Sequence, residues 1–459
     1  MLKNYPNEMD RNTEAQMKEH VMFGGPWRGP LIVRGKGVYC YDRDEKEYLD
    51  LESQAWSLCL GFGNEEVMEA AFEQAEFLYH MKGGLNTYPR LKLVDKILET
   101  APDVFDRVSF EPSGSIANEA AMKIAMINRP EARYFVSLYH AFHGNTLATA
   151  AAGWHATKAK GDAYGGGVKY MAFMDNVVRV PNPYCYRCPC GKKEGECRFE
   201  CADALRTTLQ FGVSGPAAAV ILEPVQGSGG QIPCPAGYLK RVREICDEFN
   251  TLLIFDEMQT GFGRCGTMFA MDLYGVTPDI FTIGKALGNG FPISGTVISR
   301  KLKGFQDGND DNFTFCNNPM AQAAALKTIE ILIRDNVPEN ARRMGEFLTK
   351  GLKEIQKKYP IMGDVRGPGL HIGIEMVKDP VTKEPDVVMA GAIYNKALEN
   401  GLIMGLGGSS PHVIKVKPPL IINEAECSSF LERFEKTMKE VTEETQIMES
   451  AVCQISSEY

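Results

Sequence analysis

The 459-residue sequence lacks an excess of positive charge. Its 50 lysines and arginines against 59 aspartates and glutamates give a formal net charge of −9. Proteins that bind nucleic acid normally carry a basic balance or a basic stripe. The composition therefore argues against a nucleic-acid partner, and 44% hydrophobic residues argue against a disordered chain.

Long hydrophobic runs are also missing. A membrane-spanning helix needs about 18 consecutive apolar residues, whereas the longest clean apolar stretches here are segments such as residues 217–222. The first eight residues, MLKNYPNE, contain nothing like the apolar core of a secretory signal. We therefore expect no membrane partner and a cytoplasmic location.

A disulfide framework is not expected, although the chain contains 13 cysteines. A chain of this length buries enough core to fold without covalent links. Five cysteines cluster in one short segment: Cys185, Cys188, Cys190, Cys197 and Cys201. Their CxxC spacing could bind zinc or an iron–sulfur cluster, but its irregularity favours a metal-free insertion, so no metal ligand is predicted.

Short apolar segments alternate with helical segments between about residues 105 and 300. Strands are predicted at residues 108–110, 134–138, 217–222, 252–255 and 280–283, and helices at 116–127 and 241–249. Apolar strands that alternate with helices predict a mainly parallel α/β sheet covered on both faces. Functional groups of such a sheet gather at the carboxyl ends of its strands.

The two ends of the chain depart from this pattern. Before the sheet region we expect strands at 31–33, 37–42 and 48–51 and helices at 64–79 and 91–100; after it we expect helices at 321–335, 339–359 and 387–400 and strands at 369–376 and 413–416. Three regions are predicted: an N-terminal segment at residues 1–60, a large α/β domain at 61–320, and a small α+β domain at 321–459.

A carboxylate at the end of an apolar strand is the first chemical signal. The motif FDEMQTGFGR at residues 255–264 places Asp256 where a charge is costly without a charged partner. A protonated ring nitrogen would be such a partner, and at about 4 Å and an effective dielectric near 20 it contributes on the order of 4 kcal/mol before desolvation. A capping role for the same carboxylate explains the spacing equally well.

A lysine after the next strand is the second signal. The motif GKALGNGFP at residues 284–292 contains Lys285. Partial desolvation lowers the pKa of a lysine and favours the neutral amine that forms a Schiff base. A solvated turn lysine is the more common role for such a residue alone, but its pairing with Asp256 favours the chemical interpretation.

Two further motifs follow strand ends. SGSIANEAA at residues 113–121 brings free N–H groups to the start of a helix, which suits a phosphate, although Ser113 and Glu119 could equally serve as an ordinary helix start. FHGNT at 142–146 offers Phe142 as a surface for stacking on a planar cofactor, with core packing as the alternative.

In this order, the motifs resemble those of the class III, or ω-amino-acid type, aminotransferases of the pyridoxal-phosphate fold-type I superfamily. The resemblance runs from about residue 31 to 419, and it also includes EPVQG at 223–227 and TFCNNP at 314–319. It implies a fold-type I transferase with a large, mostly parallel-sheet α/β domain and a small α+β domain from both chain ends.

The resemblance also implies roles for residues at matching positions. Lys285 would form the Schiff base with pyridoxal 5'-phosphate, and Asp256 would pair with the ring nitrogen. The remaining cofactor contacts are implied for Gly114, Ser115, Phe142, His143, Glu223 and Gln259. Thr314 matches a threonine that reaches the phosphate of the neighbouring subunit, which implies a homodimer or a dimer of dimers with composite sites.

The implied reaction moves an amino group from an amine or ω-amino acid, of the β-alanine, 4-aminobutyrate or taurine type, to a 2-oxo acid. Asp256 would keep the cofactor ring able to accept electrons, and Lys285 would move the proton as general base and then acid. One alternative is an amino-acid racemase or epimerase, and another is a phospho-lyase. A non-catalytic metal-binding module carried by the cysteine segment is an alternative of a different class.

The substrate-binding positions depart from the 4-aminobutyrate and ornithine members of the family. Those members pair a glutamate in QGEGG with a distant arginine, whereas Ser228 and Lys415 occupy these positions here. Lysine is a point charge and lacks the bidentate fork of arginine. Arg28 could supply another cation and Trp27 or Trp56 an aromatic wall, with plain surface roles as the alternative for Trp27 and Arg28.

Overall fold

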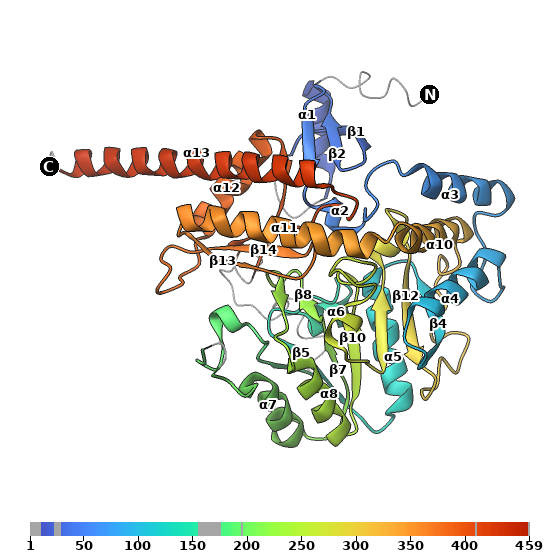
Figure 1. Ribbon diagram of the computed structural model, residues 1–459. Coiled ribbons are helices and arrows are strands. Elements are labelled where there is room, and N and C mark those ends of the chain that lie inside the picture. The colour runs from blue at the N-terminus through green and yellow to red at the C-terminus, as the bar shows by residue number, and fades with distance from the viewer. Residues whose placement is uncertain (1–10, 23–28, 155–175, 194–195, 409–410, 458–459) are drawn as a thin grey trace.

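The structure is a computed structural model that describes residues 11–22, 29–154, 176–193, 196–408 and 411–457. A seven-stranded sheet forms its centre (Figure 1). In spatial order the strands are β4 (Phe105–Glu111), β12 (Ser294–Ser299), β11 (Ile280–Ile283), β10 (Leu252–Asp256), β7 (Ala217–Leu222), β5 (Tyr134–Leu138) and β6 (Val177–Val180).

All strands of this sheet except β12 run in the same direction, which confirms the mainly parallel sheet. The predicted limits of β5, β7 and β11 agree with the structure. Strand β12 was not predicted, and it is antiparallel to both neighbours. Only about ten residues without a crossover helix separate it from β11, and a parallel return needs a longer connection.

Alternate residues of the central strands face helices on opposite sides of the sheet. Leu253 and Phe255 of β10 belong to the same apolar cluster as α8 (Tyr238–Glu248). Ile254 belongs to a second cluster with α5 (Gly114–Asn128). Because side chains alternate with a period of two along a strand, a wholly apolar strand is buried on both faces.

Two smaller sheets flank the large one, and the first of them combines strands from both ends of the chain. In one, β15 (Leu402–Ile403) pairs in parallel with β3 (Glu47–Asp50), beside β2 (Tyr39–Asp42) and β1 (Ile32–Lys36). The other has the order β13 (Met362–Arg366), β14 (Ile372–Met376), β17 (Val413–Val416) and β16 (Gly405–Gly407). The predicted union of both chain ends is confirmed, whereas the limits at residues 60 and 320 remain predictions.

Helices surround these sheets. Those that follow the large sheet are α10 (Pro319–Arg334), α11 (Val337–Lys358), α12 (Val387–Glu399) and α13 (Glu424–Ser457). Figure 1 shows α11 and α13 side by side above the large sheet, and α3 (Glu65–Phe77) and α4 (Tyr88–Thr100) at the opposite end of the molecule from the C-terminus. No helix in the described ranges has both the length and the apolar content that crossing a bilayer requires.

Some predicted limits were displaced by turn residues. The strand predicted at 369–376 begins only at Ile372, because Gly367 and Gly369 adopt φ values of +114° and +55° in a preceding turn. The helix predicted from residue 339 begins at Val337, with Pro338 in its first turn, where a missing N–H costs no helical hydrogen bond.

Candidate active site

Four parallel strands deliver polar side chains to one edge of the large sheet. Asp256 ends β10, Glu223 follows β7, Lys285 follows β11, and His143 lies beyond β5. Because these strands run in the same direction, their carboxyl ends meet at a common edge.

Asp256 is fixed by a buried chain of hydrogen bonds. Its Oδ2 lies 2.8 Å from His143 Nδ1 and accepts from Asn118 Nδ2 at 2.8 Å. Asn118 in turn accepts from Thr282 Oγ1 at 2.7 Å, and the N–H of Met258 donates to Asp256 Oδ1 at 3.1 Å. This chain fixes the orientation of a carboxylate that is only 3% exposed.

The helix-capping alternative for Asp256 does not describe its surroundings, because its oxygens are used mainly by Asn118 and His143. His143 Nε2 is buried, and no described residue bonds to it. The imidazole therefore connects Asp256 to a position that is open to a further hydrogen-bond partner.

Glu223 lies beside this chain as a second buried carboxyl group. It accepts from the N–H groups of Phe142 and Gly227, both at 3.0 Å. Burial raises the pKa of Glu223 to about 7, against the opposing effect of His143. Glu223 therefore holds together two loops of the site and titrates close to neutral pH.

Lys285 stands at the start of the short helix η6 (Lys285–Gly288) with a φ of +47°. Burial lowers the pKa of its ammonium, and the charges of Asp256 and Glu223 oppose that effect. No described acid lies within ion-pair distance of its Nζ, which faces the Trp56 ring at 5.4 Å from the centroid. The amine thus has the lowered proton affinity that a nucleophilic lysine needs.

The start of α5 is open to an anion. Ser113 occupies the N-cap position but makes no side-chain capping bond, and no acidic residue lies in the first turn. The adjoining loop is closely packed, since Ser115 Oγ accepts from the N–H of Asn145 at 3.0 Å. An uncapped helix start favours the phosphate role of Gly114 and Ser115 over the ordinary capping role.

Gln259 and Phe142 lie at the same edge of the sheet. Gln259 Oε1 is buried without a partner among the described residues. A Cβ on Gly227 would come within 1.6 Å of this oxygen, so the glycine leaves the room that Gln259 occupies. Phe142 is half-buried and follows the end of β5, as a stacking role requires.

Trp56 enters the site from a strained segment. The turn labelled α2 (Ser53–Trp56) has φ values of +38°, +46°, +60° and +68°, although none of its residues is glycine. Left-handed backbone costs about 1–2 kcal/mol per such residue. The turn is secured by Ser53 Oγ, which donates to the carbonyl of Lys417 at 2.8 Å and accepts from Arg264 at 3.0 Å.

Three lysines surround the Trp56 ring. The Nζ atoms of Lys285, Lys415 and Lys417 lie 5.4, 5.1 and 3.5 Å from its centroid. Burial lowers the pKa of Lys417 to about 7, against the effect of Glu52, with which it forms an ion pair. Burial also lowers the pKa of Lys415.

Lys415 differs from Lys417 because no acid in the described ranges lies within ion-pair distance of it. It is 8% exposed, and its Nζ would lie 3.0 Å from a Cβ on Gly407, so β16 leaves room for this side chain. The charge of Glu52 acts on Lys415 and partly offsets the burial of its ammonium, but the carboxylate of Glu52 forms its ion pair with Lys417. Lys415 is therefore suited to an anionic group supplied from outside the chain.

The loop of Ser228 is held in place from the C-terminal sheet. The carbonyl of Ser228 accepts from the N–H of Gly408 at 3.1 Å, and that of Gly230 accepts from Arg366 at 2.6 Å. Arg366 also pairs at 2.6 Å with Glu375, which is 0% exposed. The backbone of Ser228 thus contacts the end of β16, the strand that pairs with β17, which contains Lys415.

The same Glu375 anchors the cysteine segment. It accepts from Tyr184 and pairs with Arg187, both of which precede the second cysteine of the segment. No disulfide joins the 12 cysteines in the described residues, and no group of three metal-ligating side chains among those residues is placed to hold a metal ion. The hydrogen bond of Tyr184 and the ion pair of Arg187 hold the start of this segment against Glu375.

One predicted residue lies away from the other site residues, and two fall outside the described part of the chain. Thr314 is exposed on the segment between β12 and α10, in keeping with a role in a neighbouring subunit. Trp27 and Arg28 lie outside the residues that the structure describes.

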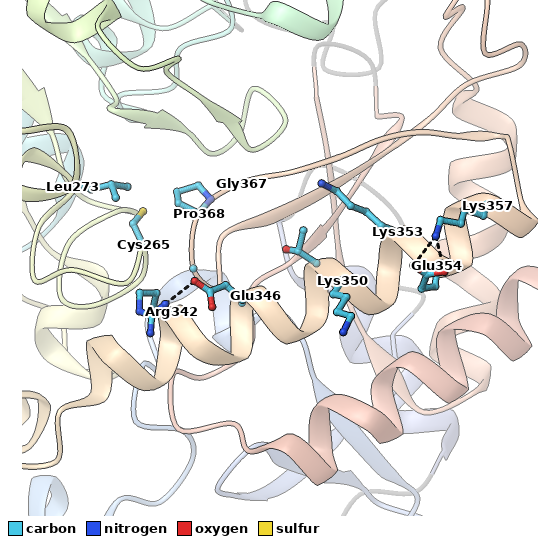
Figure 2. Close-up of a pocket in the computed structure, with 13 residues that line it drawn as sticks. Cys265, Leu273, Arg342, Glu346, Lys350, Lys353, Glu354, Lys357, Gly367 and Pro368 are labelled. Carbon is cyan, nitrogen blue, oxygen red and sulfur yellow. Dashed lines mark hydrogen bonds and ion pairs between the residues drawn. The ribbon is translucent and has the colours of Figure 1, made fainter.

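A groove of about 680 Å³ on α11 contains none of the candidate residues (Figure 2). Its charges largely pair with one another, as in Arg342 with Glu346 at 2.6 Å and Lys357 with Glu354 at 2.7 Å. These ion pairs are typical of a helix face that is exposed to solvent, so we do not assign the groove to the site.

Several residues that contact or line the site had no function predicted from the sequence. Asn118 belongs to the motif SGSIANEAA at residues 113–121. It lies one helical turn after Gly114, the first residue of α5, and this spacing could have indicated that its side chain faces the sheet. Glu52 and Lys417 are 365 positions apart, and no local pattern signals their pairing. His371, fully buried with both ring nitrogens lacking a described partner, was likewise seen only in the structure.

The arrangement fits a planar, phosphorylated cofactor with a basic ring nitrogen. It offers an open helix start for a phosphate, a fixed carboxylate for a cationic nitrogen, an unpartnered amide oxygen and a desolvated lysine. These donor and acceptor types match what the sequence motifs imply for pyridoxal phosphate.

Comparison with known families gives a match over nearly the whole chain. The sequence profile of the family described as "Aminotransferase class-III" matches residues 26–438.

Individual relatives include two different activities. A leucine/methionine racemase of Thermococcus litoralis is 34% identical over 421 residues, with coverage of 90% of this chain and 92% of the relative. A taurine–pyruvate aminotransferase of Bilophila wadsworthia is 35% identical over 437 residues, with coverage of 90% and 92%. The solved structure of an aminotransferase of Bacillus anthracis superposes with a TM-score of 0.83 at 30% identity and covers 94% of this chain and 100% of that one.

Proposed function

Because the chain belongs to the class III aminotransferase family, we propose that it transfers an amino group from an amine or ω-amino acid to a 2-oxo acid, with pyridoxal 5'-phosphate as cofactor. One observation carries the proposal. Neighbouring parallel strands bring a buried, hydrogen-bonded carboxylate, Asp256, and a desolvated lysine, Lys285, to the same edge of the sheet. If Asp256 and Lys285 had only structural roles, neither the burial of both side chains nor their position at the same edge of the sheet would be required.

The proposed cofactor contacts follow from unsatisfied groups of the site. The phosphate would lie at the start of α5, at Gly114 and Ser115, and Phe142 would cover the ring. Gln259 Oε1 and His143 Nε2 are buried atoms of the site that lack a described partner. When bound, pyridoxal phosphate supplies an electron sink for the carbon that carries the substrate amine.

The protein's own residues would then perform three tasks. Asp256, oriented by His143 and Asn118, holds a proton on the ring nitrogen through its negative charge. Lys285 Nζ moves a proton at the substrate carbon, because its desolvated ammonium gives up that proton more readily than a solvated one. Glu223 keeps the Phe142 and Gly227 loops closed around the site.

Lys415 and Trp56 support an amino donor with an anionic end. The Lys415 ammonium forms no ion pair with an acid among the described residues, because Glu52 pairs with Lys417, and it faces the same ring as Lys285. A sulfonate or carboxylate of a taurine or β-alanine type donor could supply the missing negative charge. The taurine activity named for the Bilophila relative agrees with this assignment.

A racemase or epimerase is the second candidate, because the Thermococcus relative carries the name of a racemase. A phospho-lyase is the third, since Lys415 could also bind a phosphate. The purified holoenzyme, incubated without a 2-oxo acid, separates the three when the panel of β-alanine, 4-aminobutyrate, taurine and lysine is extended by a phosphorylated amine: the chiral lysine tests the racemase, and the phosphorylated amine tests the lyase. A transaminase stops with its cofactor in the amine form, a racemase continues to turn over, and a lyase releases phosphate.

Replacement of the proposed nucleophile tests the assignment directly. We expect Lys285→Ala to lower turnover by at least about 10³-fold, because the general acid and base is lost. Its visible absorbance should change as well, because the covalent link to the cofactor is absent. Lys240→Ala removes an exposed lysine of α8 and serves as the control. Full turnover and unchanged absorbance in Lys285→Ala would contradict the proposal.

We also propose that the enzyme is a homodimer. Large apolar side chains are exposed on α3, on α4 and on the segments around them: Phe72, Phe77, Tyr79, Leu85, Tyr88, Leu91 and Phe315. Exposed apolar side chains that gather on neighbouring elements support a protein interface there. Thr314 is next to Phe315, so contact through this patch would bring it toward the phosphate site of a second copy.

A further inference from the structure

Two buried carboxyl groups face each other outside the catalytic cluster. Glu111, the last residue of β4, is 1% exposed, and the Asp311 side chain, between β12 and α10, is 4% exposed. One oxygen of each, Oε2 of Glu111 and Oδ1 of Asp311, is buried and receives no donor among the described residues. The two carboxyl groups lie within hydrogen-bonding reach of each other.

A single proton shared by the two carboxyl groups would remove the repulsion between them. Two ionised carboxylates would repel each other and leave both oxygens unsatisfied. One proton on Glu111 removes one charge and supplies the missing hydrogen bond to Asp311. Burial, followed by the charge of Asp311, raises the pKa of Glu111, which agrees with a proton on this residue.

The charged groups around Glu111 and Asp311 suit a pair that carries one negative charge in total. Lys123 of α5 places its Nζ 3.8 Å from Asp311 Oδ1 and donates to the carbonyl of Asp310 at 2.7 Å. Ser109 Oγ donates to Glu111 Oε1 at 2.5 Å. The other titratable groups that face the pair are the side chains of Asp310, Cys316 and Arg90.

The pair joins two parts of the proposed cofactor site. Glu111 is two residues before Ser113, which begins α5 and the phosphate position. Asp311 is three residues before Thr314. The far end of the same segment is fixed by Asn317, whose side chain donates to the carbonyl of Leu85 at 2.7 Å. Between these anchors, Thr314 and Phe315 are exposed.

We propose that Glu111 and Asp311 share one proton and act as positioning residues, their hydrogen bond fixing the segment at residues 304–318 so that Thr314 meets the phosphate site of the partner subunit. The inference rests on the proposed function, because Thr314 has a phosphate to reach only in a dimer that binds pyridoxal phosphate. The proton itself is a property of the single chain and is testable without cofactor.

The proton gives the pair a defined pH dependence. An unfolded glutamate titrates near about 4.3, and the folded chain holds the Glu111 proton to higher pH. Over that window the folded state binds a proton that the unfolded state has lost, so stability falls as pH rises. A glutamine at position 111 stays neutral, donates to Asp311 and removes this dependence.

The first experiment measures the thermal midpoint of cofactor-free protein between about pH 5.5 and 8.5. We expect the midpoint of Glu111→Gln to rise relative to wild type by about 2 °C or more across this range. Glu131→Gln, at an exposed glutamate beyond α5, should follow wild type. Parallel curves for Glu111→Gln and wild type would overturn the shared proton.

If Glu111→Gln does not fold, Asp311→Asn replaces it. This variant removes the neighbouring negative charge that favours the Glu111 proton, so its curve should also be flatter than that of wild type. A curve parallel to wild type would likewise overturn the proposal.

The second experiment measures the Kd of added pyridoxal 5'-phosphate. Loss of one hydrogen bond is worth about 1 kcal/mol, so Glu111→Ala and Thr314→Ala should each raise the Kd about fivefold. The double variant should show less than the product of the two effects, because both act through one segment. Glu111→Gln should stay within about twofold of wild type.

The two experiments distinguish a failure of the Glu111–Asp311 proposal from a failure of the proposed function. An unchanged Kd in Glu111→Ala, together with altered pH curves in the first experiment, would overturn the positioning role and keep the shared proton. Failure of wild type to bind pyridoxal phosphate would refute the proposed function, whereas the cofactor-free curves would still decide on the proton.

Discussion

At the scale of single residues, the orientation of Asp256 depends on groups that do not themselves react. Asn118 and His143 each contact the same oxygen of Asp256 at 2.8 Å, and Thr282 fixes the amide of Asn118. The carboxylate therefore has little freedom to turn. A ring nitrogen that approaches it would meet a negative charge already in place, which is the condition for electrostatic stabilisation without reorganisation.

Removing that charge while keeping the shape should impair chemistry more than folding. We expect Asp256→Asn to lower kcat on the order of 10²–10³-fold, because a neutral amide does not hold a proton on the ring nitrogen. Steady-state kinetics and a thermal scan measure the two effects.

A second buried aspartate provides the control for this variant. Asp279 pairs with Arg243 at 2.7 Å and is not part of the site. Asp279→Asn should lower the melting temperature and leave kcat within about twofold of wild type. Near-normal turnover of Asp256→Asn would show that the carboxylate has another role.

The positions of Lys285 and Asp256 could be predicted from sequence, and the residues that support them could not. Lys285 and Asp256 each follow an apolar strand, so local pattern alone placed them at the carboxyl edge of the sheet. The partner of Lys417 is Glu52, which the chain approaches only after both small sheets have formed. A pairing of this kind depends on tertiary structure and leaves no periodic trace in the sequence.

At the scale of elements, α2 is held in an unfavourable conformation. Ala55 is exposed and has φ +60° and ψ +42°, a region that favours glycine. We expect Ala55→Gly to raise the free energy of unfolding by about 0.5–1 kcal/mol, since the gain in the native state exceeds the added freedom of the unfolded chain.

A conventional alanine is the comparison for this prediction. Ala101, at φ −92° after α4, has no such strain, so Ala101→Gly should destabilise the protein. Urea unfolding of both variants decides the matter. Equal destabilisation by the two would mean that the turn at Ala55 stores no strain.

Glu375 connects the cysteine segment with β13 and β14. Burial alone would raise the pKa of Glu375, but the hydrogen bond with His412 and the charges of Arg366 and Arg187 outweigh burial and lower it. A depressed folded pKa stabilises the fold above the ordinary carboxyl pKa, and the contribution is lost as pH falls below it.

Substitution of Glu375 should therefore have a pH-dependent cost. At pH 7 we expect Glu375→Gln to lose about 3 kcal/mol or more, because two arginines lose their buried partner. The difference from wild type should shrink as pH falls below about 4.3. Urea midpoints at several pH values measure both effects.

An exposed pair gives the matched control for Glu375. Glu435 pairs with Lys358 at 2.5 Å on the surface, and Glu435→Gln should change stability by less than about 1 kcal/mol. A loss in Glu375→Gln that stays the same from pH 7 down to about pH 3 would contradict the ionised state of Glu375.

Elements were predictable where the pattern was local. The buried strands β5, β7 and β11 contain only apolar or small residues and needed no partner to be recognised. The left-handed α2 could not be foreseen, because its sequence, Ser-Gln-Ala-Trp, contains no glycine. Its conformation is imposed by tertiary contacts of Ser53, which local propensity does not encode.

At the scale of the whole molecule, the apolar patch on α3 and α4 predicts the oligomeric state. Phe77 is 87% exposed and Tyr88 is 75% exposed. We expect the double variant Phe77→Asp, Tyr88→Asp to sediment as a monomer and to lose cofactor affinity, because two buried charges in an interface are costly.

Phe211 offers a control that is 76% exposed but lies in η5 (Thr208–Gly212), away from the patch. Phe211→Asp should sediment as wild type does in the same analytical ultracentrifugation experiment. A wild-type protein that is monomeric at micromolar concentration would contradict the proposed dimer.

The overall architecture was predictable only in part. Alternation of strands and helices indicated the parallel sheet, whereas the pairing of β15 with β3 joins residues about 350 positions apart. The resemblance to class III aminotransferases, rather than any periodicity, indicated that both chain ends build one small domain.

The unlinked cysteines give this protein a selective chemical handle. Burial raises the pKa to about 12 for several thiols: Cys40, Cys59, Cys201, Cys246 and Cys427. Such thiols stay protonated at neutral pH and react slowly with maleimides. A fluorescent maleimide would instead label the partly exposed cysteines between residues 185 and 197. Because Tyr184 and Arg187 connect this insertion to Glu375, the dye would report any separation of the two during turnover.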